Sequence, residues 1–331
     1  MKVVVFDTHK FDRMALEAAN QGQHELRFLE VRLTEETALL ASGYEAVCLF
    51  ANDRADEKTL RSLKSAGVKL IALRSAGFNH VDIKCAKSLQ LTVVRVPAYS
   101  PYAVAEYTVA LLQTLNRKIH KAHNRVHDMN FSLDGLVGFD LHGKTVGVVG
   151  TGKIGKVFCQ IMRGYDCRVL ACDGQPDIDW GFKHNVQYVE REFLFKESDI
   201  VSLHVPLTPE TNHIIDASAL GLMKKDVIIV NTGRGALIET QALISSLKEQ
   251  CIGGACLDVY EEEAGIFFSD LSENGINDDI LARLLTFPNV LVTSHQAFLT
   301  REALKNIAET TISNISKFEK NLDISDVEVK I

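Results

Sequence analysis

Residues 146–155, VGVVGTGKIG, decide the fold of this chain. An apolar, β-branched run leads into Gly150, Gly152 and Gly155, and a helical pattern begins directly after them. Glycines at this spacing suit a backbone that wraps around a pyrophosphate. The first permits the tight turn, the second lets the main chain approach the phosphates, and the third lets helix and strand pack closely. The phosphates then face the N–H groups at the helix N-terminus.

An acidic residue follows this motif at the distance that a dinucleotide site requires. A second strand, at residues 168–172, ends in Asp173, close to the roughly 20-residue offset at which a carboxylate binds the adenosine ribose. This carboxylate would repel a 2′-phosphate, and no Arg follows it in Gly174-Gln175-Pro176. A glycine turn between any strand and helix can imitate the motif, but this context favours a dinucleotide, and NAD over NADP.

Length and composition set the class of protein. The 331 residues are too many for one ordinary core, so two domains are expected. The 36 Lys and Arg against 43 Asp and Glu give a net charge of −7, which predicts no general attraction to nucleic acid or anionic membranes. The seven cysteines lack CxxC spacing and several fall in apolar runs, as in reduced cytoplasmic proteins. The amino terminus has too short an apolar run for a signal peptide.

The first hundred residues predict a small α/β layer of their own. Strand-like runs at residues 2–6, 47–50, 70–73 and 91–96 alternate with helical stretches, among them 35–42 and 56–66. This layer has no phosphate fingerprint, so it should serve a different ligand. Its loop at residues 74–79, RSAGFN, could turn backbone N–H groups toward a ligand carboxylate, or be an ordinary strand-to-helix turn. Tyr99, in a second loop, could be a pocket wall or a packed aromatic.

One long helix is expected between residues 102 and 130. It carries an apolar stripe and is longer than the crossover of a small domain requires, so it should link the two domains and offer an oligomer surface. His120, His123 and His127 lie on it at spacings that resemble a metal site. No Cys or acid completes a ligand set, and basic residues interleave, so a solvated basic face and no metal are predicted.

Further strands at residues 200–205, 227–231, 252–258 and 290–294 bring the second domain to six, the number of a complete dinucleotide-binding fold. Ligands bind at the carboxyl ends of such strands, where Arg234, Glu263 and His295 stand. Arg offers a planar fork for a carboxylate, His exchanges a proton near neutral pH, and a carboxylate beside His favours the protonated ring. With a nicotinamide, these residues could reduce a 2-oxo acid. Each also has a plain structural interpretation: a helix-end contact for Arg234, an acidic surface run for Glu263, and a core histidine for His295.

Several longer motifs carry a resemblance to a known family. They are GTGKIG at 150–155, HVPLTPET at 204–211, NTGRGALIE at 231–239, LDVYEEE at 257–263 and SHQAFLTREAL at 294–304, extended by RSAGFNHVD at 74–82, VPAYSP at 96–101 and the run from 130 to 155. Together they resemble the D-isomer-specific 2-hydroxyacid dehydrogenases, nearest to the fermentative D-lactate dehydrogenases of bacteria. The resemblance covers nearly the whole chain.

The resemblance implies an α/β fold in which a Rossmann dinucleotide-binding domain is inserted in a smaller, flavodoxin-like α/β substrate domain. The substrate domain would comprise residues 1–100 and 299–331, and the NAD-binding domain residues 101–298. A helix at 301–320, with Leu304, Ile307, Ile312 and Ile315 facing inward, would return to the first domain.

The resemblance also implies a role for individual residues. Arg234 would orient the substrate, His295 would be the acid/base and Glu263 its paired acid. The backbone of Ala76 and Gly77 would receive the substrate carboxylate, and Tyr99 and Phe298 would form a small apolar pocket beside its C3. The cofactor would be held by Gly150, Gly152, Lys153, Ile154, Gly155, Asp173, Val205, Pro206, Thr211, Thr232, Gly233 and Asp258. Close relatives often carry Asn where this chain has Thr211, and the broader family often has Pro where it has Ala264.

The function so implied is an NAD-dependent D-lactate dehydrogenase that reduces pyruvate with NADH in the cytoplasm, as a homodimer or homotetramer. An enzyme of the 2-hydroxyisocaproate or glyoxylate/hydroxypyruvate type is the nearest alternative. A second class is an NADH-sensing protein like the corepressors that share this fold. These 331 residues include no low-complexity arm of the kind that recruits partners, which favours the enzyme over the NADH sensor.

Overall fold

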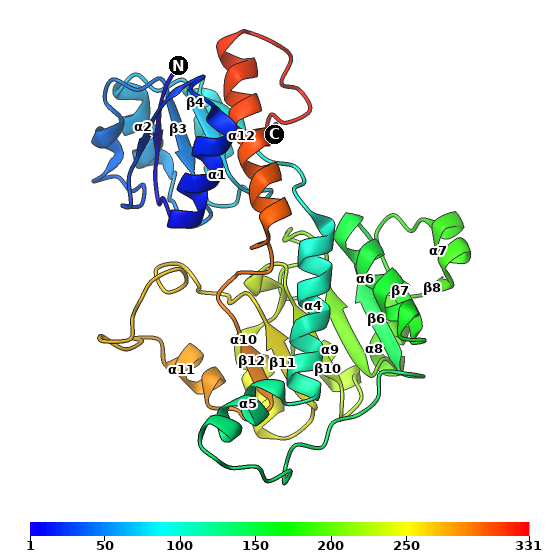
Figure 1. Ribbon diagram of the computed structural model, residues 1–331. Helices are drawn as coiled ribbons and strands as arrows, with labels where there is room; N and C mark the ends of the chain where they lie inside the picture. Colours follow the sequence, from blue (N-terminus) through cyan, green and yellow to red (C-terminus); the bar gives the residue numbers. More distant parts are fainter. Residues whose placement is uncertain (331) are drawn as a thin grey trace. The chain divides into compact units, whose positions relative to one another are not determined.

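The computed structural model describes residues 1–330, which form two compact units (Figure 1). Unit 1 consists of Met1–Ser100 together with the described residues from Leu299 onward, and unit 2 is Pro101–Phe298. Each unit is built around its own parallel sheet. The chain therefore enters unit 2 from unit 1 and returns to unit 1 at its end.

Unit 2 contains a parallel sheet with the strand order β12-β11-β10-β9-β6-β7-β8. Apart from the added β12, this is the 3-2-1-4-5-6 order of the Rossmann fold. The order reverses beside β6, and ligands of such sheets bind at the carboxyl ends of the strands at this point. The strands are β6 (Thr145–Val149), β7 (Arg168–Cys172), β8 (Val186–Tyr188), β9 (Ile200–Leu203), β10 (Ile228–Asn231), β11 (Gly254–Leu257) and β12 (Val290–Val292). The predicted Rossmann fold is confirmed.

Helices cover both faces of this sheet, and α4 packs against α6 in Figure 1. On that face Leu112, Val148 and Phe158 are fully buried in one core cluster. The opposite face holds a second cluster with Leu203, Ile229 and Leu243. The helical elements of the unit are α4 (Pro101–Asn116), α5 (Ile119–His127), α6 (Lys153–Gly164), α7 (Ile178–His184), α8 (Arg191–Glu197), α9 (Ala217–Leu222), η2 (Gly235–Leu237), α10 (Thr240–Lys248) and α11 (Asp279–Leu285).

Unit 1 contains a parallel sheet with the order β2-β1-β3-β4-β5, the 2-1-3-4-5 order of flavodoxin-like folds. Successive residues of β1 face opposite sides: Val4 joins the core under α2 and α3, while Val3 and Val5 join the core under α1 and α12. The elements are β1 (Lys2–Val5), α1 (Lys10–Asn20), β2 (Glu25–Phe28), η1 (Ala38–Ala41), β3 (Ala46–Leu49), α2 (Glu57–Ser65), β4 (Leu70–Leu73), α3 (Ile83–Ser88), β5 (Thr92–Val94) and α12 (Arg301–Glu319). The flavodoxin-like prediction is also confirmed.

Two edge strands, β2 and β8, were not predicted from the sequence. β2 is only partly buried, with exposed and half-buried residues in alternation, and β8 has three residues. Neither carries the continuous apolar run that marks the central strands. The helix predicted at residues 35–42 is a short 3₁₀ turn, Ala38–Ala41. The helix predicted at 301–320 is confirmed as α12, in which Ile307, Ile312 and Ile315 are buried while Leu304 is half-buried.

The prediction of a single helix between residues 102 and 130 was wrong. The structure breaks it into α4 and α5, because Lys118 has a left-handed backbone with φ of 51°. The Asn116 side chain pairs instead with the backbone of Phe139, donating to its carbonyl at 2.8 Å and accepting from its N–H at 2.9 Å. Helix α5, which carries His120, His123 and His127, has no buried residue. Among the helices of residues 1–330, none combines the length and apolar character needed to cross a bilayer.

The turn between β6 and α6 depends on two glycines. Gly150 has a φ of 95°, and a Cβ there would lie 2.7 Å from the backbone carbon of His204. A Cβ on Gly155 would lie 2.0 Å from the carbonyl oxygen of Gly150, well inside van der Waals contact. The helix can start this close to the strand only because position 155 has no side chain.

Gly155→Ala should therefore lower the free energy of unfolding of unit 2 by about 1–3 kcal/mol, and with it the melting temperature, because the added methyl group overpacks a rigid contact. Gly164→Ala is the matched control, because Gly164 ends the same helix and no atom lies within 4 Å of the place that its Cβ would occupy. That control should be neutral or slightly stabilising, since Ala favours helix over Gly. Differential scanning calorimetry would measure both, and equal melting temperatures for the two variants would contradict the contact.

Candidate active site

The glycine loop after β6 has the form of a phosphate cradle. Gly152 caps α6 with an extended backbone, and open space lies within 4 Å of where its Cβ would be. The first N–H groups of a helix have no partner within it, so those of Lys153, Ile154 and Gly155 can serve a ligand. The loop therefore fits a pyrophosphate that approaches over Gly152.

Asp173 lies one residue beyond β7, beside this cradle. Its Oδ2 accepts a hydrogen bond from the Thr151 N–H at 2.6 Å, and its Oδ1 accepts one from the Gln175 N–H at 2.8 Å. Partial burial raises the pKa of Asp173, but these bonds, the Thr151 hydroxyl and the charge of Lys156 together hold that pKa below its usual value. A carboxylate that stays ionised accepts hydroxyl groups and repels a phosphate, as an NAD site requires.

The loop after β9 carries the predicted contacts Val205, Pro206 and Thr211. His204 begins this loop, and burial lowers its pKa to about 3, so its ring is neutral and packs against Phe158. The hydroxyl of Thr211 donates to the Pro206 carbonyl at 2.6 Å. Thr211 thus closes a turn within its own loop, and its contact with a cofactor remains a prediction.

The loop after β10 presents Arg234. Asn231 is fully buried and shapes this loop, since its amide donates to the Arg234 carbonyl at 2.8 Å and accepts from the Gly233 N–H at 3.0 Å. The Thr232 hydroxyl lies 2.8 Å from that of Thr108 on α4. Asn231 had no predicted role, although an Asn at a strand end is typical of such a turn.

His295 and Glu263 form a close pair at the same edge of the sheet. His295 Nδ1 lies 2.7 Å from Glu263 Oε1, and each side chain is 19% exposed. A carboxylate only accepts hydrogen bonds, so Nδ1 is the donor and Nε2 is the nitrogen that faces away from this partner. The second oxygen of Glu263 accepts the Tyr260 N–H at 3.1 Å, which holds the carboxylate in place.

Asp258 anchors the segment that carries His295. Its buried carboxylate accepts the Thr293 hydroxyl at 2.6 Å, the Gln296 N–H at 2.9 Å and the Ala297 N–H at 2.8 Å. The N–H of His295, whose φ is 52°, donates to the Asp258 carbonyl. Both oxygens of Asp258 are thus used by residues 293–297. Asp258, predicted from the sequence to line the cofactor site, thus holds residues 293–297 with His295 in its unusual backbone conformation.

A second histidine–carboxylate pair joins three of these loops. His213 Nε2 lies 2.5 Å from Glu261 Oε1, and Glu261 Oε2 accepts the Thr240 hydroxyl at 2.8 Å. Partial burial raises the pKa of Glu261, but the bonds from Thr240 and His213 hold it below its usual value. A Cβ on Gly235 would lie 2.1 Å from the Tyr260 carbonyl, so the Arg234 loop and the Glu263 loop are in direct contact. This pair was not predicted, because nothing in the spacing links residues 213 and 261.

The loop after β4, in unit 1, has its own fixed geometry. The Ala76 carbonyl accepts from Arg95 at 2.9 Å and the Gly77 carbonyl accepts from the Ser75 hydroxyl at 2.7 Å. A planar trans peptide directs its N–H away from its carbonyl, so the Gly77 N–H points away from Arg95. Arg74 is buried at the base of the loop and donates to the Phe6, Asp7 and Cys48 carbonyls. Of the other predicted substrate residues, Tyr99 belongs to unit 1 and Phe298 ends unit 2.

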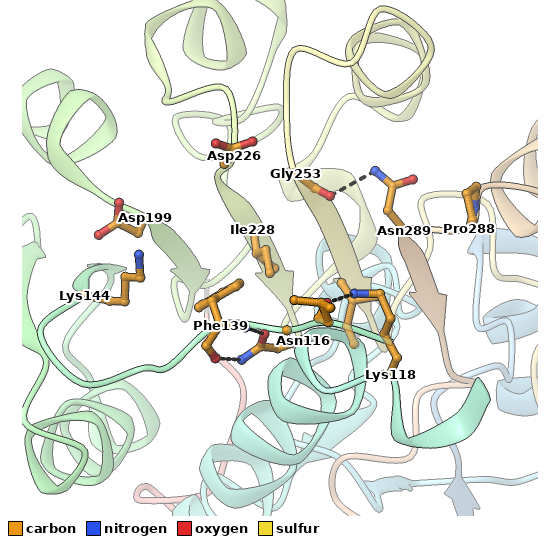
Figure 2. Close-up of a pocket in the computed structure, with 13 residues that line it drawn as sticks. Asn116, Lys118, Phe139, Lys144, Asp199, Asp226, Ile228, Gly253, Pro288 and Asn289 are labelled. Atoms are coloured by element: carbon orange, nitrogen blue, oxygen red, sulfur yellow. Dashed lines mark hydrogen bonds between the residues drawn. The ribbon is translucent and has the colours of Figure 1, made fainter. Parts of the chain in front are cut away.

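A cavity of about 430 Å³ lies at the opposite edge of the unit 2 sheet, and Figure 2 shows the residues that line it. It lies at the amino ends of the strands, where Lys144, Asp199 and Asn289 precede β6, β9 and β12. Several of its polar groups pair with one another or with backbone, as the Gly253 carbonyl does with Asn289 at 3.0 Å. The predicted site residues stand at the carboxyl ends instead, so this cavity is not the candidate site.

Comparisons with known proteins identify the family of this chain. Residues 109–297 match the family model of the D-isomer specific 2-hydroxyacid dehydrogenase, NAD binding domain. The chain is 51% identical to D-lactate dehydrogenase of Escherichia coli K12, over 97% of each chain. Two solved structures are similar along nearly their whole length. The apo-structure of the Escherichia coli D-lactate dehydrogenase has a TM-score of 0.91 at 48% identity, covering 100% of both chains, and the pyruvate reductase of Chlamydomonas reinhardtii has 0.93 at 42%, covering 98% of both.

The glycine cradle, the ionised acid beside it and the matched family model lead to the same assignment. The chain belongs to the D-isomer-specific 2-hydroxyacid dehydrogenase family, and unit 2 contains its NAD-binding domain.

Proposed function

We propose that this protein is an NAD-dependent D-lactate dehydrogenase that reduces pyruvate to D-lactate with NADH. The observation that carries the proposal is the His295–Glu263 pair at 2.7 Å, on strand-end loops next to the one that presents Arg234. The relative that is 51% identical over 97% of the chain bears the name of this activity. Reduction of a 2-oxo acid needs a hydride from a nicotinamide, a cation to hold the substrate carboxylate and a proton donor, and Arg234 and the His295–Glu263 pair can serve as the cation and the donor.

Each residue has a defined part in this proposal. Bound NADH supplies the hydride that adds to C2 of the 2-oxo acid. Arg234 holds the substrate carboxylate and keto oxygen through its planar fork, which fixes the angle of approach. His295 Nε2 gives its proton to the keto oxygen as charge develops there, and Glu263 stabilises and orients the ring through Nδ1.

Unit 1 is proposed to bind the remainder of the substrate. The backbone N–H groups of Ala76 and Gly77 receive its carboxylate, supported by the direction of the Gly77 N–H described above. Tyr99, which belongs to unit 1, and Phe298, which ends unit 2, are the residues proposed to select the C3 substituent, with a preference for a methyl group over a phosphate. Residues 1–100 and 299–331 would thus form the substrate-binding domain.

The reaction product tests the proposal. With NADH, pyruvate should give the highest kcat/KM among pyruvate, hydroxypyruvate, 2-oxoisocaproate and phenylpyruvate, and chiral chromatography should identify D-lactate. Preference for 2-oxoisocaproate or hydroxypyruvate would assign the alternative enzyme types. L-lactate as product, or tight NADH binding with negligible turnover, would overturn the proposal; the latter is the result expected of an NADH sensor.

Substitutions should separate the two catalytic roles. His295→Gln should lower kcat by about 10²–10⁴-fold, the usual contribution of a proton donor, with NADH affinity nearly unchanged. Arg234→Lys should lower kcat/KM for pyruvate by about 10- to 100-fold, since a point charge cannot replace a planar fork. His142→Gln is a suitable control because its side chain is 76% exposed. Stopped-flow kinetics and NADH fluorescence would measure these values; an unchanged kcat in His295→Gln would remove it as the donor.

We further infer that the chain works as a homo-oligomer in the cytoplasm. Its seven cysteines are all free, as expected in a reducing compartment. Large apolar side chains are exposed on α5 and on the loop that follows it, among them Met129 at 77%, Leu133 at 79% and Val137 at 83%. Figure 1 shows the course of this long loop after α5. An apolar stretch of this extent is typical of a surface that a partner covers.

The oligomer should be detected by light scattering coupled to size exclusion. The wild-type protein should have at least twice the mass of one chain, and Leu133→Ser combined with Val137→Ser should shift it toward the monomer. Ile178→Ser combined with Phe182→Ser is the control, since these exposed residues lie on α7. A monomeric wild type would contradict the inference.

A further inference from the structure

A chain of polar side chains crosses the carboxyl ends of three neighbouring strands. Thr151 lies two residues beyond β6, Asp173 lies one residue beyond β7, and Tyr188 is the last residue of β8. These strands are adjacent in the sheet, where Ala171 of β7 pairs with Tyr188. Hydrogen bonds connect the three side chains: the Tyr188 hydroxyl to the Thr151 hydroxyl at 2.8 Å, and the Thr151 hydroxyl to Asp173 Oδ2 at 3.0 Å.

The direction of these bonds follows from the chemistry of the groups. A carboxylate can only accept, so the Thr151 hydroxyl gives its single proton to Asp173. The Thr151 oxygen must then accept the proton of Tyr188. The tyrosine thereby fixes the orientation in which the threonine serves the carboxylate. Thr151 is 5% exposed, so little water is available to replace either bond.

We propose that Tyr188 acts through Thr151 as a positioning residue for Asp173. The hydrogen-bonded side chains Tyr188, Thr151 and Asp173, called the relay below, set the affinity for NADH and the preference for NADH over NADPH. The inference deepens the proposed function, because it rests on Asp173 as the carboxylate that binds the adenosine ribose. Thr151 lies between Gly150 and Gly152, so the relay connects the phosphate-binding loop to the Asp173 carboxylate that is proposed to bind the ribose.

The relay constrains Asp173 Oδ2, whereas Oδ1 keeps an acceptor position for the cofactor. Oδ2 is held by the N–H and hydroxyl of Thr151, and Oδ1 by the Gln175 N–H. A carboxylate offers about four acceptor positions, so these three bonds leave about one, on Oδ1, to which a ribose hydroxyl can donate. The same fixed negative charge repels a 2′-phosphate, which carries up to about two negative charges near neutral pH. Loss of the relay should thus weaken NADH binding and leave NADPH binding little affected.

The hydroxyl of Tyr188 has a role separate from that of its ring. The ring packs tightly against α7, where a Cβ on Gly181 would lie 2.8 Å from Tyr188 Cε2. Tyr188→Phe keeps this packing and removes only the donor to Thr151. Thr151→Val keeps the side-chain shape and the backbone N–H to Asp173, and removes the hydroxyl. The two substitutions therefore test the relay without emptying the core.

Fluorescence titration should give the Kd of each variant for NADH and for NADPH. Tyr188→Phe should weaken NADH binding by about 3- to 10-fold, the effect of one hydrogen bond, and Thr151→Val by at least as much. The variant that combines Tyr188→Phe with Thr151→Val should bind NADH no more weakly than Thr151→Val alone, since Tyr188 acts only through the threonine hydroxyl. The ratio of the NADPH and NADH dissociation constants should fall in parallel. Thr151→Ser, which restores a hydroxyl, should recover most of the NADH affinity.

Tyr165→Phe is the matched control, because Tyr165 lies at the end of α6 and is 40% exposed. It should leave both dissociation constants unchanged. The relay is rejected if Tyr188→Phe leaves NADH affinity unchanged, if it weakens NADH and NADPH equally, or if it acts as strongly in the Thr151→Val background as alone. Should Tyr188→Phe fail to fold, the comparison of Thr151→Val with Thr151→Ser decides the role of the hydroxyl.

Asp173→Asn separates the failure of the relay from the failure of the proposed function. Loss of NADH preference in Asp173→Asn, with no effect in Tyr188→Phe, would reject the relay and keep Asp173 as the ribose ligand. An unchanged preference in Asp173→Asn would instead remove Asp173 from the cofactor site, and the relay would have no carboxylate to position.

Discussion

The rest of unit 2 depends on the contact between the end of β6 and the start of α6. A side chain at Gly155 would come within 2.0 Å of the Gly150 carbonyl, so helix and strand approach as closely as their backbones allow. This approach brings the helix N-terminus to the carboxyl edge of the sheet, at the point where the strand order reverses. Anion binding there follows from the N–H groups that a helix start leaves without partners.

The position of the His295–Glu263 pair depends on a second constraint, the buried carboxylate of Asp258. Three hydrogen bonds from residues 293–297 converge on it, and burial raises its pKa while these bonds oppose that rise. The cost of burying the charge is offset only while all three donors stay in place. This explains how His295 keeps a left-handed backbone, which a non-glycine residue adopts at some cost in energy. The site is therefore preorganised by residues outside the proposed catalytic trio.

Much of the fold and the candidate site could be predicted from the sequence. The central strands are continuous apolar runs, and the glycine motif, Asp173, Arg234, Glu263 and His295 all directly follow such runs or stand in the loops after them. Short edge strands were not predictable, because β2 and β8 are partly exposed and carry no such run. The break after α4 also escaped prediction, because nothing in the local pattern marks the left-handed backbone of Lys118, and the hydrogen bonds beside it join Asn116 to Phe139, 23 residues away.

The sequence by itself indicated the family through the resemblance of its longer motifs, and it determined the apolar strand runs and the order of the reactive side chains, since periodicity and spacing are local properties of a chain. The tertiary structure alone decided which side chains meet. Residues 295 and 263, 213 and 261, and 188 and 151 are paired because parallel strands bring their carboxyl ends to one edge, whatever their separation in sequence. Only the structure showed that Asp258 binds the segment that carries His295. A hydrogen bond requires a distance and a direction, and the spacing of residues in the sequence gives neither.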